Sequence, residues 1–233
     1  MQLPLPYPFV YPSTTLLVGK SKKGKSSLTK NIVLSKCLDG TFQFGIVFCK
    51  SKFNHGYNYV PDHAVIDGLD YDVLNSYINK LKEYKEKTNK TIPNFIIFDD
   101  LQGVLNENAD LNSLFSMARH YGSSLFICVQ YMNRACSTTM RENVDYLLAF
   151  NSKTGNTIDS LHTSFGKTFS RKVEPFAQHF QAQTKKPYHA MLFIEDEDHL
   201  ENNYLSIVGL PPERMNGIKL KFSDENEEND QDK

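Results

Sequence analysis

The chain of 233 residues is predicted to be an α/β protein in three layers, with a mainly parallel sheet between two layers of helices. Short apolar runs alternate with stretches of helical periodicity, which is the order that parallel strands and crossover helices produce. The runs at 95–98 and 125–129 are continuously apolar, which is typical of strands buried on both faces of a parallel sheet. A hydrophobic content of 40%, with 16 Phe residues, is sufficient for a sizeable core.

The expected elements follow in order from this alternation. Strands are expected at 15–18, 42–49, 95–98, 125–129, 146–150 and 188–194. Helices are expected at 26–36, 72–87, 111–121 and 156–181, with a helix or turn at 138–143. Asp70 or Asp72 is a suitable N-cap for the second helix, Gly122 should end the third, and a break is expected near Gly166. Residues 50–68 contain Gly and Pro and are expected to be irregular.

Three segments are expected: an extended, Pro-rich strap at 1–12, a single domain at 13–222, and an acidic tail at 223–233. Residues 224–233 include six acids and one Lys and carry −5; because the whole chain carries −1, the remainder carries +4. The tail should be disordered because it has no apolar residue to bury. A mildly basic body is compatible with a polyanionic partner but does not require one.

Several classes of protein are disfavoured by simple features of the chain. The N-terminal residues lack the basic segment and apolar core of a signal peptide. No apolar stretch approaches the roughly 18 residues of a membrane span, so no membrane association is expected. The four Cys residues have no metal-binding spacing, and Cys49 and Cys128 lie in or beside apolar runs, so reduced, intracellular thiols are expected.

A glycine- and lysine-rich segment between an apolar strand and a helix has the pattern of a Walker A phosphate-binding loop. Glycines let the backbone approach phosphate closely, and successive N–H groups form an anion-binding nest at the start of the helix. Lys25 is expected to reach the β- and γ-phosphates, and Ser26 to ligate Mg²⁺. An ordinary surface turn is the alternative. The expected phosphate-binding residues are Gly19, Lys20, Ser21, Lys22, Lys23, Gly24, Lys25, Ser26 and Ser27.

Two aspartates follow the apolar strand at 95–98, as in a Walker B motif. Ligands bind at the carboxyl ends of strands in sheets of this kind. Asp99 is therefore expected to hold Mg²⁺, and Asp100 to orient or deprotonate the attacking water. The alternative is a pair of capping or turn aspartates, which are common after strands.

Two further polar residues are candidates for the catalytic site. Gln130 ends the strand at 125–129, where its amide can contact the γ-phosphate or the attacking water. Arg119 can stabilise charge on the transferred phosphoryl group, in a site belonging to a neighbouring subunit. A polar strand end and a solvated helix-end arginine are the respective alternatives, and Arg134 and Arg141 are weaker candidates for the arginine.

Together these residues resemble the FtsK–HerA superfamily of DNA-pumping ATPases, and in particular the poxvirus-type genome-packaging ATPases of large DNA viruses and virophages. The similarity covers roughly residues 13–165. Its most specific part is residues 118–130, where an Ala-Arg pair and a Gly precede a strand that ends in Gln. The resemblance implies a RecA-like P-loop fold of the additional-strand type, with one strand inserted between the Walker A and Walker B strands.

The same resemblance implies an Mg²⁺-dependent ATPase that forms a ring, a hexamer or pentamer, with active sites between subunits. It implies double-stranded DNA and capsid proteins as partners, and the cytoplasm of an infected host cell, at the viral factory or with the virion, as the location. Lys25, Ser26, Asp99, Asp100, Gln130 and Arg119 occupy the matching motif positions. Many relatives have Glu at the position of Asp100. The Asp side chain is one methylene shorter than Glu, so the attacking water would have to lie closer to it.

The surface that contacts DNA is less well defined by sequence. Lys167, Arg171 and Lys172 are candidates, as are Lys185 and Lys186, although such residues are often simply solvated. Two other functions remain open. The chain could be a small-molecule kinase, although it has no clear Arg-rich lid, or it could bind nucleotide as a switch in virion assembly. A GTPase is disfavoured because the Asn-Lys-x-Asp motif is absent.

Overall fold

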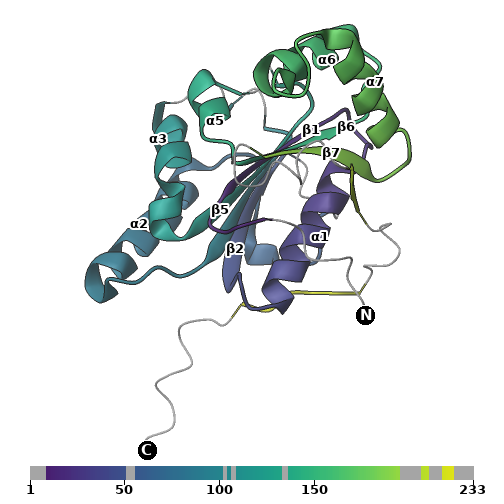
Figure 1. Ribbon diagram of the computed structural model, residues 1–233. Coiled ribbons are helices and arrows are strands. Elements are labelled where there is room, and N and C mark those ends of the chain that lie inside the picture. Colours follow the sequence, from purple (N-terminus) through teal and green to yellow (C-terminus); the bar gives the residue numbers. More distant parts are fainter. Residues whose placement is uncertain are drawn as a thin grey trace, which may run out of the picture.

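A twisted sheet of eight strands crosses the computed structural model, with helices on both faces (Figure 1). The structure describes residues 9–50, 56–101, 104–105, 109–132, 136–194, 206–209 and 217–222. The strand order within these residues is β3-β2-β4-β5-β1-β6-β7-β8. The strands are β1 Thr14–Val18, β2 Phe44–Cys49, β3 Val65–Asp67, β4 Asn94–Asp99, β5 Ser123–Val129, β6 Tyr146–Phe150, β7 His189–Ile194 and β8 Ser206–Val208.

The predicted mainly parallel sheet is confirmed. Strands β1 to β6 pair in parallel, whereas β7 is antiparallel to both β6 and β8. Strand β5 lies between β1 and β4 and pairs with each of them. It is therefore the inserted strand that the family resemblance implies, and it separates the strand before the glycine-rich loop from the strand before the two aspartates.

The helices in the described part of the chain are α1 Lys25–Leu38, α2 Tyr71–Thr88, α3 Ala109–Met117, α5 Thr138–Glu142, α6 Gly155–Leu161 and α7 Val173–Thr184. Asp70 is the N-cap of α2, since its carboxylate accepts from the backbone N–H groups of Asp72 and Val73. A 3₁₀ turn, η3 Ala118–Tyr121, extends α3, and Gly122 ends it with φ 76°.

The sequence prediction was wrong in detail at two places and correct at a third. Residues 50–68 were expected to be irregular, but they include a 3₁₀ turn, η2 Asp62–Ala64, and the edge strand β3. Strand β8 was not predicted, because three residues give too little periodicity to read. The region 156–181 is divided into α6, a π-helical turn η4 His162–Gly166, and α7, so the expected break is present.

The core consists of two clusters, one on each face of the sheet. Leu16 and Val18 face the cluster that packs under α2, α3, α5, α6 and α7, whereas Leu17 faces the cluster under α1. This alternation along a single strand shows that β1 is covered on both faces, as its continuously apolar sequence indicates. Three layers result, with β1 and the loop that follows it near the middle of the sheet (Figure 1).

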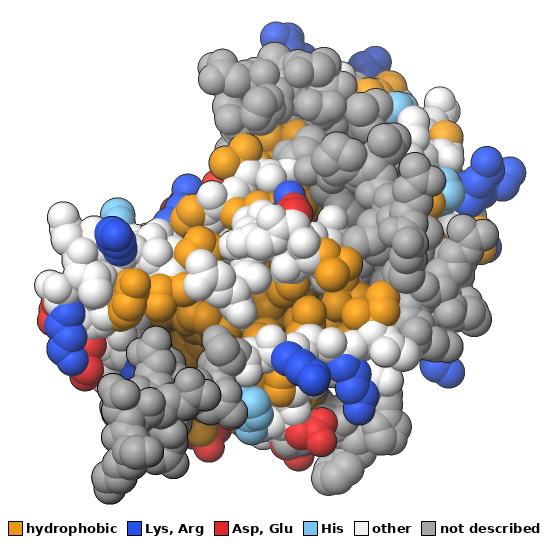
Figure 2. Space-filling view, turned by 90° about the horizontal axis from the view of Figure 1, so that it is seen from below, with side chains coloured by type: hydrophobic (Ala, Val, Ile, Leu, Met, Phe, Trp, Pro, Cys, Tyr) orange, Lys and Arg blue, Asp and Glu red, His pale blue; other side chains and the backbone are white. Residues whose placement is uncertain are grey.

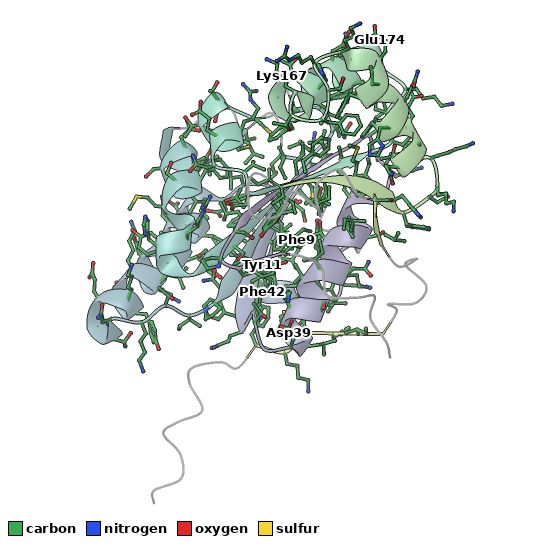
Figure 3. The ribbon with its side chains drawn as sticks, viewed as in Figure 1. Phe9, Tyr11, Asp39, Phe42, Lys167 and Glu174 are labelled. Atoms are coloured by element: carbon green, nitrogen blue, oxygen red, sulfur yellow. The ribbon has the colours of Figure 1, made fainter. Side chains whose placement is uncertain are left out.

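Residues 9–12, the described part of the Pro-rich stretch, pack against the α1 side of the sheet (Figure 3). The ring centroids of Phe9 and Tyr146 are 4.7 Å apart, and those of Tyr11 and Phe42 are 4.9 Å apart. The backbone N–H of Val10 donates to the Tyr146 hydroxyl at 2.8 Å. Residues 1–8 and the acidic tail 223–233 lie outside the described residues.

On the face seen from below, apolar side chains are exposed in the middle and charged side chains lie at the margin (Figure 2). In the described part of the chain, no helix is long and apolar enough to cross a membrane. The four cysteines, all described, form no disulfide, and Cys49, Cys128 and Cys136 are buried.

The close pairing of β2 with β4 depends on a glycine. Gly45 lies opposite Phe95 in the register, and a Cβ built on Gly45 would lie 2.5 Å from the Phe95 ring, which is fully buried. We therefore predict that Gly45→Ala lowers the free energy of unfolding by about 1–3 kcal/mol, measured by urea denaturation. Gly155→Ala is the control, because a Cβ there meets nothing within 4 Å. It should be neutral or stabilising by up to about 1 kcal/mol. Equal stability of the two variants would contradict the packing argument.

Candidate active site

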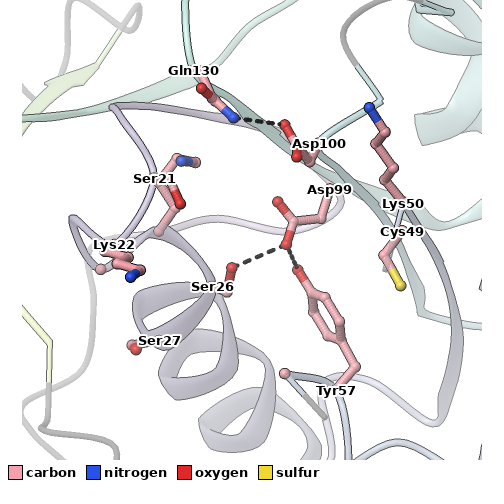
Figure 4. Close-up of a pocket in the computed structure, with 13 residues that line it drawn as sticks. Ser21, Lys22, Ser26, Ser27, Cys49, Lys50, Tyr57, Asp99, Asp100 and Gln130 are labelled. Carbon is pink, nitrogen blue, oxygen red and sulfur yellow. Dashed lines mark hydrogen bonds between the residues drawn. The ribbon is translucent and has the colours of Figure 1, made fainter. Parts of the chain in front are cut away.

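The predicted site residues meet at one edge of the sheet because three parallel strands end there. The glycine-rich loop follows β1, Asp99 and Asp100 end β4, and Gln130 follows β5. The register places Val18 beside Val129 and Asp99 beside Cys128, so the three strand ends are level. Between them lies a cavity of about 280 Å³ (Figure 4). Sheets of this type bind ligands in such a position.

The backbone of the loop is held in a conformation that suits an anion. Gly24 has φ 109° and Lys22 has φ 62°, both in the left-handed region, and such alternation turns successive N–H groups inward. A Cβ on Gly19 would lie 2.7 Å from the Cβ of Phe150, so the loop packs tightly on the end of β6. Helix α1 begins at Lys25 with no side-chain cap and no acid in its first turn. Its N-terminal N–H groups and dipole are thus left for an anionic ligand.

Lys25 is held inside the loop by backbone carbonyls. Its side-chain amine donates to the carbonyl of Gly19 at 2.6 Å and to that of Lys20 at 3.3 Å, and the residue is 8% exposed. Both acceptors are neutral, and no carboxylate of a described residue lies at hydrogen-bonding distance from the ammonium group. An anionic ligand in the loop would therefore gain a charge-assisted interaction with Lys25.

Asp99 is the centre of a small hydrogen-bonded cluster. Its Oδ2 accepts from the Ser26 hydroxyl at 3.0 Å and from the Tyr57 hydroxyl at 2.7 Å (Figure 4). Burial raises the pKa of Asp99, while the hydrogen bonds from Tyr57 and Ser26 and the charge of Lys25 oppose that rise. The hydroxyl of Ser26 and the carboxylate of Asp99 are thus close enough to contact the same bound ion.

This pair of oxygen ligands fits a hard divalent cation. Mg²⁺ in nucleotide sites commonly takes one or two protein oxygens and completes its shell with phosphate oxygens and water. No group of three or more His, Cys, Asp or Glu residues that could hold a metal is found among the described residues. A metal at Ser26 and Asp99 would therefore depend on a bound phosphate for its remaining ligands.

Asp100 and Gln130 form the second polar pair of the cavity. The Gln130 side-chain amide donates to Asp100 Oδ1 at 3.0 Å. Asp100 has φ 57°, which is unusual for a residue other than glycine, and its N–H donates to the Cys128 carbonyl at 3.2 Å. These contacts hold the Asp100 carboxylate at the cavity wall, with its orientation tied to the end of β5.

The sequence analysis missed one part of this site. Tyr57, Lys50 and Gly56 also line the cavity, and they come from the segment after β2 that was expected only to be irregular. Tyr57 is 6% exposed, and its ring is 6.0 Å from that of Tyr59. The only sequence signal was the aromatic pair itself, since no local pattern indicates that a tyrosine 42 positions earlier contacts Asp99.

Arg119 lies at the opposite edge of the sheet from the loop. It precedes β5, whereas Gln130 follows it, and seven strand residues span roughly 20 Å. Its guanidinium forms an ion pair with Asp145 at 3.0 Å and donates to the Asn143 carbonyl. Asp145 Oδ2 in turn accepts from the N–H of Thr14 at 2.7 Å. Arg119 therefore cannot contact a nucleotide in its own subunit and helps to fix the starts of β1 and β6.

The other cationic candidates that the structure describes also lie away from the cavity that contains the aspartates. Arg141 donates to the carbonyl of Cys136 and does not line the site, and Arg134 lies outside the described residues. Lys167 lies on the surface near α6 and α7 (Figure 3), and Arg171 and Lys172 are exposed before α7. Lys185 and Lys186 instead line a second cavity beside the loop.

The inserted strand, the glycine-rich loop after β1 and the acidic pair after β4 give this chain the fold of the P-loop nucleoside triphosphatases. Residues 11–207 match the family model described as Poxvirus A32 protein. The chain belongs to this family. A search of curated proteins finds no match.

Solved structures with the same fold include viral packaging enzymes. The genome-packaging NTPase B204 of Sulfolobus turreted icosahedral virus 2, in complex with AMPPCP, is 16% identical with a TM-score of 0.59, covering 86% of this chain and 98% of that one. The cytoplasmic domain of the type VII secretion ATPase EccC of Thermomonospora curvata is 14% identical with a TM-score of 0.58, covering 84% and 25%. The conjugation coupling protein TcpA of pCW3, with ATPγS, is 12% identical with a TM-score of 0.55, covering 85% and 60%.

The contact of Tyr57 with Asp99 generates a prediction. Tyr57→Phe removes one of the two hydroxyls that orient the carboxylate, so it should weaken Mg²⁺ affinity about tenfold. The measurement is the Mg²⁺ concentration that half-saturates binding of a non-hydrolysable ATP analogue. Binding of the analogue without metal should not change.

Tyr59→Phe is a matched control for this variant. The Tyr59 hydroxyl is buried and has no hydrogen-bond partner within the described part of the chain, so its removal leaves Asp99 in place. The same Mg²⁺ shift in both variants would mean that packing of the aromatic pair, rather than the hydrogen bond to Asp99, is responsible.

Proposed function

We propose that the protein is the ATP-hydrolysing subunit of a motor that moves double-stranded viral DNA into a capsid. The observation that carries this proposal is the hydrogen bond between Ser26 and Asp99, which brings the phosphate loop and the acidic pair to one cavity. Membership of the Poxvirus A32 family and the fold shared with a viral genome-packaging NTPase support the DNA-packaging role.

The chemistry follows from positioning and charge. The loop N–H groups, the α1 N-terminus and Lys25 would bind the triphosphate, and Ser26 and Asp99 would hold Mg²⁺. When bound, the metal would supply charge neutralisation for the phosphate oxygens. Asp100 accepts a proton from the attacking water, because it is the second carboxylate of the cavity and projects from the same strand end. Most of the rate enhancement in phosphoryl transfer comes from such placement.

Gln130 is proposed to link the nucleotide state to the position of Asp100. In the structure its amide donates to Asp100 Oδ1 at 3.0 Å. A γ-phosphate between loop and sheet offers a stronger, charged acceptor for the same amide. If the Gln130 amide donated to the γ-phosphate instead, Asp100 could turn toward the attacking water. Loss of the phosphate would restore the hydrogen bond between Gln130 and Asp100.

Arg119 is proposed to act on the site of a neighbouring subunit. Its place at the far edge of the sheet excludes a role in its own site, while its side chain is 42% exposed and accessible. A ring of six or five subunits would bring this edge to the next phosphate loop. Contacts with DNA would be to phosphates and hence salt-sensitive, and capsid proteins would receive the complex in the infected cell's cytoplasm.

The decisive experiment compares two variants for ATP binding and for DNA-stimulated turnover. Lys25→Ala should weaken ATP binding about 10- to 100-fold, since it removes a charge-assisted hydrogen bond. Asp100→Asn should retain ATP binding and lose about 10²- to 10⁴-fold in kcat, since it removes the proton acceptor. Lys80→Ala, an exposed lysine on α2, is the control and should behave as wild type.

Each alternative function has its own outcome in that assay. Turnover that ignores duplex DNA and rises with a small phosphate acceptor would indicate a kinase. ATP binding that depends on Lys25, with negligible turnover that Asp100→Asn does not change, would indicate a nucleotide-dependent assembly switch.

The role of Arg119 between subunits can be tested by mixing variants. Arg119→Ala and Lys25→Ala should each be inactive alone, but mixed rings should recover part of the turnover. In a mixed ring, a subunit with an intact phosphate loop can receive Arg119 from a Lys25→Ala neighbour. Mixing Arg141→Ala with Lys25→Ala is the control, and Arg141→Ala alone should stay active. Mixed Arg119→Ala rings that assemble yet stay inactive would contradict the proposal.

A further inference from the structure

A second, larger cavity lies on the other side of the phosphate loop. Its volume is about 780 Å³, and its walls are the loop, residues 151 and 153 after β6, and the turn at 184–189 before β7. Lys22, Gly24 and Ser27 line both this cavity and the one that contains the aspartates. The loop is thus a common wall, and a ligand seated on it can extend in both directions.

The order of the strands fixes which part of a nucleotide lies on each side. β5 and β4, with Gln130 and the aspartates, lie on one side of β1, and β6 and β7 lie on the other. A triphosphate whose γ end and metal face Asp99 must direct its α-phosphate and nucleoside toward β6 and β7. The first cavity, at about 280 Å³, lies just below the roughly 300–1,000 Å³ of small-molecule sites, so it suits only part of a nucleotide.

The second cavity contains an aromatic ring in an unusual backbone position. Tyr188 has φ 62°, which is strained for a bulky residue, and its carbonyl accepts from the N–H of Gly209. The ring is beside the loop, since a Cβ on Gly24 would lie 3.8 Å from Tyr188 Cδ1. Of the four described non-glycine residues with positive φ, three surround the loop: Lys22, Asp100 and Tyr188. The strained backbone thus holds an aromatic face against the phosphate site.

The remaining lining groups complete a site for an anionic, partly aromatic ligand. Among the described residues, no acidic side chain lines the cavity, whereas five lysines do: Lys22, Lys23, Lys153, Lys185 and Lys186. The Asn151 side-chain amide donates to the Thr184 hydroxyl at 3.2 Å, so the carboxamide oxygen is the group through which Asn151 can accept a hydrogen bond from a ligand. Cations, one aromatic ring and an amide oxygen match a nucleoside attached to phosphate.

We infer that this second cavity binds the nucleoside end of ATP, with the Tyr188 ring stacked on the base and the lysines around the α-phosphate. The inference rests on the proposed function, because it assumes that the loop binds the triphosphate. It gives Lys185 and Lys186 a role in nucleotide binding. Their position in the wall of the cavity that the loop also lines favours this role over contact with DNA, and DNA contact becomes an outcome of the test.

The test uses Tyr188→Gly, with ATP and inorganic tripolyphosphate as separate probes. Glycine adopts the φ of this position without strain, so the variant should fold and be at least as stable as wild type. Loss of the stacked ring should weaken ATP binding about tenfold. Binding of tripolyphosphate, which has no nucleoside, should not change. Tyr188→Phe keeps the ring and should bind ATP as wild type does.

Three outcomes would overturn the inference. One is unchanged ATP affinity in Tyr188→Gly. Another is an equal loss of ATP and tripolyphosphate binding, which would mean that the ring only supports the loop. The third is a Lys185→Ala/Lys186→Ala variant that loses salt-dependent binding to duplex DNA and keeps its ATP affinity. Failure of the proposed function is distinguishable, because it would show in the wild-type protein, as turnover that ignores duplex DNA or as binding of neither ATP nor tripolyphosphate.

Discussion

The hydrogen bond from Ser26 to Asp99 is the contact on which the site depends. It joins the first turn of α1 to the end of β4 across 73 positions of sequence. The two groups can meet only because β1, β5 and β4 are parallel, adjacent and in level register. Any slip of β5 would move the acidic pair away from the phosphate loop. The apolar faces of β1 prevent such a slip, because they are buried on both sides of the sheet.

The inserted strand β5 does more than separate the two motifs. Its carboxyl end places Gln130 against Asp100, and the Val129 carbonyl accepts from the N–H of Gly19, so the strand end contacts both halves of the site. Tyr57 adds a third support from the segment after β2. Asp99 is consequently held by hydroxyls from two separate segments. The orientation of the carboxylate is thus set by the protein's own hydroxyl groups, and such placement is what phosphoryl transfer depends on.

Charge is divided between the two edges of the sheet. The loop edge has an uncapped helix N-terminus, Lys25 and a ring of lysines around the second cavity, and all of these favour anions. The opposite edge holds Arg119 in an ion pair with Asp145. One subunit therefore has the proposed nucleotide site at one edge and an accessible arginine at the other. This polarity is what a head-to-tail ring would use, and it follows from the direction of the parallel strands.

The sequence alone determined the α/β class, the parallel sheet, the phosphate loop and the acidic pair, because each depends on local spacing or on short apolar runs. Asp70 as a helix cap and Gly122 as a helix end were equally local. Tertiary structure decided what local patterns do not encode. It brought Tyr57 to Asp99, tied Gln130 to Asp100, placed Arg119 at the far edge and put Tyr188 beside Gly24. These contacts join segments far apart in the chain, and only strand order and register make them neighbours.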